Sequence, residues 1–273
     1  MEGRRKAIRL VSIERAHLVR LVLVLSGVLS FAASIFLNSQ VLAFIGLGLA
    51  FWGALFFLIT PRRYVEGSLL GNSTISTYKT VSRIIKDLQV MSHGYYIPPF
   101  PKSSYIPDYL KGLKEIVVFI PKSNIVETPS IEEMAKGKFI LEKTKGVLIV
   151  PPGAGLLDRI EREFDVDFNN MDFGTLSELL PRFMLENFGL AEEMELTVTK
   201  DLANVEVTGS LYSSFYSNEP NMESIAILGC PVVSAVACAL AKASGRIVVL
   251  HTLQYIPTSD QIKAEFSIVQ VRE

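Results

Sequence analysis

The sequence predicts an α+β protein in which an N-terminal transmembrane helical hairpin precedes a cytoplasmic mixed α/β domain with a largely antiparallel sheet. One observation is that residues 21–60 contain no Asp, Glu, Lys, Arg or His. The other is that short runs of alternating apolar and polar residues, typical of strands, mix with helical periodicity after residue 115. We therefore divide the chain into a basic amphipathic tail (1–20), the hairpin (21–60), a helical and Pro/Tyr-rich connector (61–112) and the soluble α+β domain (113–273).

The charge-free run is long enough to cross a membrane twice. A helix rises about 1.5 Å per residue, so forty residues span about twice a ~30 Å hydrocarbon core. The polar residues 38–40 divide the run, which predicts helices over 21–37 and 41–60. Small residues recur every four positions in both helices and predict a close contact between them, or a seam between copies of the chain. They are Ser26, Ser30 and Ser34 in the first helix and Gly46, Ala50 and Ala54 in the second.

Charge beside the hairpin predicts its orientation. Residues 1–20 hold six basic and two acidic side chains, and Arg62 and Arg63 follow the second helix. By the positive-inside rule, both chain ends face the cytoplasm, so we expect a multi-pass protein of the cell membrane. The tail either rests on anionic headgroups or only sets this topology. A cleaved signal peptide fits poorly, because a second apolar run follows the first at once.

Composition also bounds the partners of the soluble part. Residues 64–273 hold 19 basic and 26 acidic side chains, which argues against nucleic acid as a partner. The two cysteines, Cys230 and Cys238, are too few for a disulfide framework.

The first half of the soluble part contains a helix, an irregular segment and three strands. Ser73 or Thr74 is expected to begin a helix that continues to residue 90. Residues 95–107 contain four prolines and three tyrosines, which predicts an extended surface linker or a polyproline II ligand rather than a central strand. Residues 115–121, 138–142 and 146–152 are expected to be strands.

The second half alternates helices with strands. We expect a helix over 156–164, a second helix opened by Thr175 or Ser177 and ended by Gly189, and a β-hairpin from 194–200 and 204–210. An apolar strand at 224–228 precedes a helix that starts at Pro231 and stops at Gly245. That helix is apolar nearly all round and should be buried against the sheet, and the strands 246–257 and 262–271 should form a pair.

Three residues are weak candidates for a binding site. Gly153 and Gly155 lie between a strand and a helix, where backbone N–H groups can hold an anion, but Asp158 occupies the third position of the dinucleotide motif. Cys230 lies at a helix N-terminus, where the helix dipole would lower its thiol pKa. The apolar run before it favours a buried, inert cysteine instead.

Other chemistries lack their motifs. His17, His93 and His251 are scattered, the two cysteines are eight residues apart, and residues 165–174 do not have the spacing of a calcium loop. The sequence therefore predicts no catalytic residue, no metal site and no cofactor.

Three segments carry a resemblance to other proteins. Residues 150–163, 180–190 and 229–246, placed after two spans, resemble an uncharacterised family of archaeal two-span membrane proteins. The order of helix and two strands at the C-terminus is more weakly similar to V4R-type small-molecule-binding domains. Those domains usually have cysteines in the last strand pair, where this chain has His251 and Tyr255.

The expected function is that of a membrane-anchored binding or scaffold protein. The expected partners are the lipid bilayer, a protein or a small hydrophobic ligand, and a second copy of the chain is a further candidate through the spans. The alternatives are a membrane-tethered enzyme that acts on a lipid or nucleotide, and an accessory subunit of a membrane complex.

Overall fold

The computed structural model describes residues 22–37, 39–58, 67–89, 93–99, 115–122, 129–169, 171–218 and 222–269. The chain divides into two compact units, Met1–Tyr64 and Val65–Glu273, and each is described by itself. The predictions for the tail (1–20) and for residues 100–107 of the Pro/Tyr segment lie outside the described residues.

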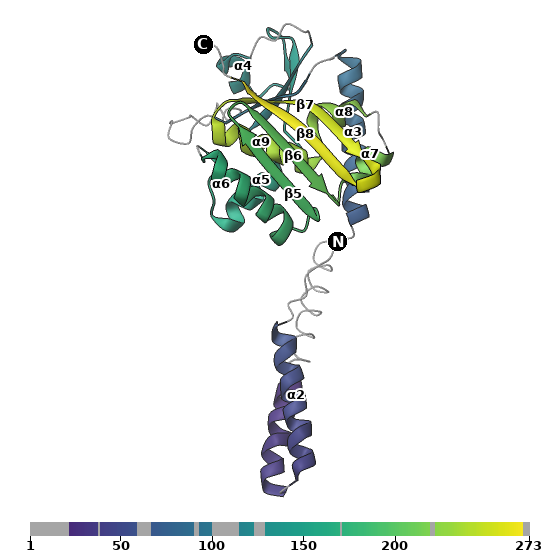
Figure 1. Cartoon of the computed structure of the whole chain (residues 1–273), viewed down its shortest axis with the longest axis vertical. Coiled ribbons are helices and arrows are strands. Elements are labelled where there is room, and N and C mark those ends of the chain that lie inside the picture. Colours follow the sequence, from purple (N-terminus) through teal and green to yellow (C-terminus); the bar gives the residue numbers. More distant parts are fainter. Residues whose placement is uncertain are drawn as a thin grey trace. The chain divides into compact units, whose positions relative to one another are not determined.

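The first unit is the predicted helix pair (Figure 1). A helix over Val22–Leu37 is followed by α2 (Gln40–Leu58), which contains no charged residue. The two helices touch through glycine: a Cβ on Gly27 would lie 2.5 Å from the Ala50 nitrogen, and one on Gly46 would lie 2.6 Å from the Phe31 nitrogen. Close backbone contact therefore requires glycine at both positions.

Ser34 of the predicted serine stripe is buried in this unit, with 7% of its surface exposed. The hydroxyls of Ser26 and Ser34 donate to carbonyl oxygens of their own helix, those of Leu23 (3.0 Å) and Phe31 (2.6 Å). Gly46 and Ala50 contact the first helix as predicted, and Gly27 is the small residue that receives them. These bonds satisfy the hydroxyls within the first helix, and the small serine side chains still allow a close approach of the second helix.

By length and hydropathy, the stretch that could cross a membrane is not one of the two N-terminal helices. Among the described residues, only the stretch Glu223–Ser244 is both long and apolar enough to cross a membrane, and 89% of its apolar window is buried within the protein. This stretch comprises two consecutive helices in the core of the second unit, Glu223–Leu228 and Pro231–Ser244. The two N-terminal helices are apolar but shorter, with the first at Val22–Leu37.

The second unit contains an eight-stranded antiparallel sheet, which confirms the predicted fold class. The strand order is β3-β4-β2-β1-β7-β8-β6-β5, and every described neighbouring pair is antiparallel. The strands are β1 (Tyr95–Ile97), β2 (Val117–Pro121), β3 (Ile140–Leu141), β4 (Gly146–Ile149), β5 (Glu193–Thr199), β6 (Leu202–Thr208), β7 (Ile247–Ile256) and β8 (Gln261–Val269).

Helices cover one face of this sheet. In Figure 1, α9 passes behind the strands, with α5 and α6 toward β5 and with α3, α7 and α8 at the other end. These helices are α3 (Gly67–Asp87), α5 (Ala154–Phe164), α6 (Phe173–Arg182) with a π-helical turn (Phe183–Asn187), α7 (Ser213–Asn218), α8 (Glu223–Leu228) and α9 (Pro231–Ser244). α9 is buried almost throughout, as predicted, and ends at Gly245 with φ of +63°.

The opposite face is covered at one end only. A small cluster of Phe119, Leu141 and Leu148 packs there with Met134 of α4 (Ile131–Ala135). Over β5, β6, β8 and the second half of β7, most of the alternate side chains are polar and exposed or half-buried, and Leu202 and Val269 are exposed apolar exceptions at strand ends. An antiparallel sheet tolerates such a solvated face because its strands can alternate apolar and polar residues.

Two strand assignments from the sequence are wrong. Tyr95–Ile97 was expected in a surface segment, but it forms β1 in the middle of the sheet, between β2 and β7. Pro98 follows the last paired residue, so it removes no hydrogen bond from the ladder. Residues 224–228, expected as a strand, form the short helix α8, whose Ile225 and Leu228 both enter the core.

Two helix starts also differ from the prediction. α3 begins at Gly67, so Ser73 and Thr74, either of which was expected to begin this helix, both lie inside it. α6 is capped by Asp172, whose side chain accepts a hydrogen bond from the Thr175 N–H (2.8 Å). Aspartate is a preferred N-cap residue, and Asp172 lies three residues before Thr175, where the helix was predicted to begin.

Candidate functional site

The weak candidate Cys230 lies at a buried polar network around the start of α9. The Tyr78 hydroxyl donates to the Gly229 carbonyl oxygen (2.7 Å), and the Cys230 N–H donates to the Tyr216 hydroxyl (3.0 Å). The Tyr96 hydroxyl donates to the Leu228 carbonyl oxygen (2.6 Å). Burial raises the pKa of all three tyrosines, so they stay neutral donors and acceptors.

Gly153 belongs to the same network. Its N–H donates to the Ser234 hydroxyl on the first turn of α9 (3.1 Å), and a Cβ on it would lie 2.0 Å from the Ala235 nitrogen. Gly153 is therefore required because α5 begins against the backbone of α9. Gly155, two residues later, is exposed, and a Cβ on it would meet no atom within 4 Å.

The two thiols are enclosed by the core. Cys230 and Cys238 are both fully buried, and burial raises the pKa of each thiol. For Cys230, burial outweighs the lowering effect of the backbone N–H groups at the start of α9. The structure thus brings Gly153 and Cys230 to one place, but it surrounds them with packed side chains rather than with a site open to a substrate.

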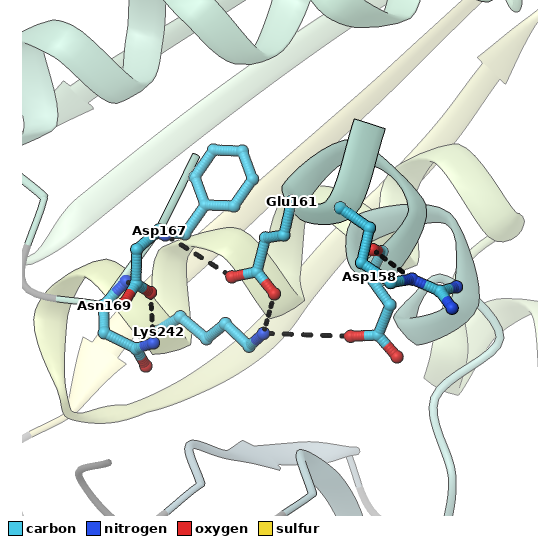
Figure 2. Close-up of polar contacts among 7 residues, drawn as sticks. Asp158, Glu161, Asp167, Asn169 and Lys242 are labelled. Carbon is cyan, nitrogen blue, oxygen red and sulfur yellow. Dashed lines mark hydrogen bonds and ion pairs between the residues drawn. The ribbon is translucent and has the colours of Figure 1, made fainter. Parts of the chain in front are cut away.

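A second buried polar cluster joins α5, α9 and the loop after α5 (Figure 2). The Lys242 ammonium lies 2.8 Å from Glu161 and 3.9 Å from Asp158. The other oxygen of Glu161 accepts from the Phe168 N–H (3.4 Å). Lys242 lies in the last turn of α9, where a positive charge also interacts favourably with the helix dipole. These contacts hold three segments together and satisfy every charge, so we assign the cluster a structural role.

The acidic loop after α5 uses its carboxylates locally. Asp167 accepts hydrogen bonds from the backbone and side-chain N–H groups of Asn169, and Asp172 caps α6. No group of three or more His, Cys, Asp or Glu side chains suited to a metal ion occurs among the described residues.

The uncovered polar side chains of four strands form one continuous surface, which we call the open sheet face. It consists of Glu193, Glu195, Thr197, Asn204, Glu206, Thr252, Gln254, Gln261, Lys263, Glu265 and Ser267. The strand register places these residues in rows across the sheet; Glu195, Glu206, Lys263 and Gln254 form one row. The alternate residues of the same strands are buried under the helices, which fixes the orientation of this face.

Charge on the open sheet face is only partly paired. Glu206 accepts from the Lys263 ammonium (2.7 Å) and from the Gln261 side-chain amide (2.9 Å). Within the described part of the chain, Glu193, Glu195 and Glu265 have no ion pair. Glu195 also lies directly opposite Glu206, and like charges in that arrangement are destabilising. The face is therefore acidic, and its unpaired carboxylates can accept hydrogen bonds from a basic partner.

Two histidines that are far apart in the sequence meet beside this face. β1 pairs with β7 so that Tyr95 lies opposite Val249, and the same register brings His93 to His251, with ring centroids 5.7 Å apart. Sequence patterns give no signal for this pair, because only the strand pairing brings the two rings together. His251 lies at an irregularity in the β7–β8 pairing, and its Nε2 is 2.7 Å from the Ser267 hydroxyl.

Comparison with known proteins identifies the family of the chain. A family model described as a domain of unknown function, DUF7982, matches residues 2–264. The chain belongs to this family. Searches of curated proteins and of solved structures found no match. Membership of DUF7982 extends over both compact units, so the helix pair and the sheet domain occur together in one family.

Proposed function

We propose that this DUF7982 protein is a membrane-anchored binding protein. The helix pair inserts in a bilayer, and the sheet domain binds a protein partner on the cytoplasmic side through the open sheet face. The observation that supports this proposal most directly is the distribution of exposed apolar side chains. Of 21 large hydrophobic residues that are exposed in the described chain, 15 lie in the helix pair, between Val22 and Phe56.

Lipid is the covering that best suits these side chains. Phe36, Ile35 and Phe44 are 90%, 70% and 75% exposed, and neither helix contains a charged residue. The hydrophobic effect strongly disfavours so large an apolar surface in water. Each helix can satisfy its own backbone hydrogen bonds, which a segment in a bilayer must do.

A basic protein segment is the partner that best fits the open sheet face. Three of its glutamates have no ion pair in the described structure, and the polar side chains are held in fixed rows by the sheet. Complementary charge increases both the association rate and the selectivity of such an interface. The domain as a whole is acidic, with 26 acidic and 19 basic residues over 64–273.

A photo-crosslinking amino acid tests this proposal in the membrane-bound full chain. Placed at Asn204, in the open sheet face, it should yield a discrete crosslinked protein, whereas the exposed control position Glu178 on α6 should not. The added variant Glu195→Lys/Glu265→Lys should abolish the Asn204 crosslink. Equal crosslinking at both positions, or a crosslink that survives charge reversal, would contradict the assigned face.

A membrane-tethered enzyme that acts on a lipid or nucleotide is the second candidate. It is favoured by one observation, the 2.7 Å contact between His251 and Ser267, which is a base-to-nucleophile distance. Against it, His251 has no carboxylate partner among the described residues to orient its ring. Ester hydrolysis by the purified chain that Ser267→Ala abolishes would establish this function instead.

Two further hypotheses for the function are a V4R-type small-molecule-binding domain and an accessory subunit of a membrane complex. The order α9, β7, β8 is compatible with a V4R-type small-molecule-binding domain. In this chain, however, Tyr255 of the strand pair stacks on Tyr216 and donates to Asp260 (2.9 Å). Native mass spectrometry of the purified chain would reveal a retained hydrophobic ligand, and co-purification of other membrane spans would indicate a complex.

A further inference from the structure

The far edge of the sheet, opposite β5, differs in composition from the rest of the domain. We define the lysine edge as the exposed lysines and large hydrophobic residues around α4 and the β3–β4 turn: Lys122, Ile131, Lys136, Lys138, Phe139, Ile140, Lys143 and Lys145. Only six large hydrophobic side chains are exposed in the described part of the second unit, and three of them, Ile131, Phe139 and Ile140, lie here. The described residues of this region include five exposed lysines and two exposed glutamates, in a domain that is acidic overall.

A buried carboxylate holds these lysines together. Glu133 on α4 is only 8% exposed and accepts hydrogen bonds from the Lys143 N–H (3.1 Å) and from the Thr144 hydroxyl. The Ser130 side chain caps α4 by accepting from the Glu133 N–H (3.3 Å). Glu133 thus fixes the end of α4, with Lys136, against the β3–β4 turn.

The strand pairing adds the remaining members. The Lys122 N–H donates to the Lys145 carbonyl oxygen (2.8 Å), because β2 pairs with β4 at this end. A shallow hollow lies between these elements and is lined in part by Lys136, Lys138, Ile140 and Lys143. Among the described residues of this edge, the exposed acidic ones are Glu132 and Glu142, and Glu142 pairs with Lys138 at 3.6 Å. Positive charge therefore remains in excess.

We propose that the lysine edge is a docking surface for an anionic lipid bilayer. Ile131, Phe139 and Ile140 would enter the interfacial region, and the lysines would lie beside phosphate headgroups with their apolar stems against the acyl boundary. Each lysine beside an anionic surface raises the affinity about fivefold. The inference rests on the proposed function, since the membrane anchor keeps the domain beside a bilayer. It adds that the domain contacts lipid itself, with the acidic open sheet face on other strands left for a protein.

The test uses the full chain reconstituted in nanodiscs, and hydrogen exchange measured by mass spectrometry. Exchange over 131–145 should slow at least fivefold in discs with 30% phosphatidylglycerol relative to discs of phosphatidylcholine alone. Exchange over β5 should be the same in both. The variant Lys136→Gln/Lys138→Gln should abolish the difference between lipids.

A matched control removes the same charge elsewhere. Lys86→Gln/Lys200→Gln also deletes two exposed lysines, of which Lys86 has an exposed ion pair with Glu223, as Lys138 has with Glu142. This control should behave as wild type. Equal exchange in the two lipids, or an equal effect of the two double variants, would overturn the lysine edge as a lipid surface.

The same data separate failure of this inference from failure of the proposed anchor. If the amides of 22–58 are protected in the discs while 131–145 responds to neither lipid, the anchor holds and the lysine edge is overturned. If 22–58 exchanges freely, both proposals are overturned. Protection of 131–145 by an added acidic peptide or nucleic acid, and not by anionic lipid, would assign the surface to that partner and overturn the lipid assignment.

Discussion

Gly153 and Gly155 show how differently two neighbouring glycines are constrained. A methyl group on Gly153 would meet the backbone of α9, whereas one on Gly155 would enter open space within the first turn of α5. We expect Gly153→Ala to destabilise the domain by about 3 kcal/mol, because the clash is with backbone that cannot rotate away. Gly155→Ala should stabilise it by about 0.5 kcal/mol, because alanine loses less entropy in a helix. Urea unfolding followed by circular dichroism measures both, and a neutral Gly153→Ala would contradict the close approach.

Lys242 tests whether the buried cluster of Figure 2 is structural. Lys242→Met leaves the carboxylate of Glu161 buried without its partner, and removing one member of a buried pair costs about 3–5 kcal/mol. The double variant Glu161→Leu/Lys242→Met should recover much of that loss, because no charge is then left buried. Urea unfolding of the single and double variants provides the comparison. Additive losses would show that the two residues do not interact in the way described.

The carboxyl of Glu133 should make the local stability of the lysine edge depend on pH. Hydrogen bonds from Thr144 and Lys143 lower the pKa of this carboxyl below its usual value. The charged form therefore stabilises the contact of α4 with the β3–β4 turn above the unfolded-state pKa of about 4.3, and that stability is lost as pH falls through the lowered folded-state pKa. Hydrogen exchange over 131–145 should accelerate only at acidic pH, and Glu133→Gln should remove this dependence. A wild-type response centred near neutral pH would contradict the assignment.

At the scale of single elements, the helix pair provides a matched test. Gly46 lies against the first helix, whereas Gly48 on α2 meets no atom within 4 Å. Gly46→Leu should force the helices apart, and Gly48→Leu should leave them in place. Spin labels at the exposed positions Leu29 and Leu47 would report the distance between the helices. We expect a longer and broader distribution for Gly46→Leu alone, and equal distributions in both variants would refute the described seam.

Sequence patterns predicted the elements whose local signals agree with their tertiary setting. α9 has Pro231 at its start and Gly245 after its end, and β5 and β6 alternate apolar and polar residues. β1 was missed because three residues before Pro98 give no strand signal, and its place is set by β2 and β7 on either side. The meeting of His93 with His251 follows from that register, so it could not be predicted before β1 was known.

The surfaces were harder to predict than the core. The open sheet face follows from alternation once the helix-covered face is known, but the sequence alone does not say which helices cover the sheet. The lysine edge depends on Glu133, a charged residue that becomes buried by bonding to the turn ten residues later. Single-residue patterns do not reveal such a contact. Gly153 and Cys230 were predicted as weak site candidates because they lie beside helix starts. In the structure, both positions are closely packed in the core.

At the scale of the whole molecule, the protein has three surfaces that differ in chemistry. The helix pair is apolar and free of charge, the open sheet face is acidic, and the lysine edge combines lysines with exposed apolar side chains. Under the proposed membrane anchor, these surfaces would contact the lipid interior, a protein partner and lipid headgroups, in that order. The membrane assignment is the premise on which the other two roles depend.

Membrane fractionation of the full chain tests that premise most directly. If the helix pair lies within the bilayer as proposed, the full chain should remain in the membrane pellet after extraction with alkaline carbonate and be released only by detergent. A chain that begins at Val65 should appear in the carbonate supernatant. Recovery of the full chain in the soluble fraction without detergent would contradict the account.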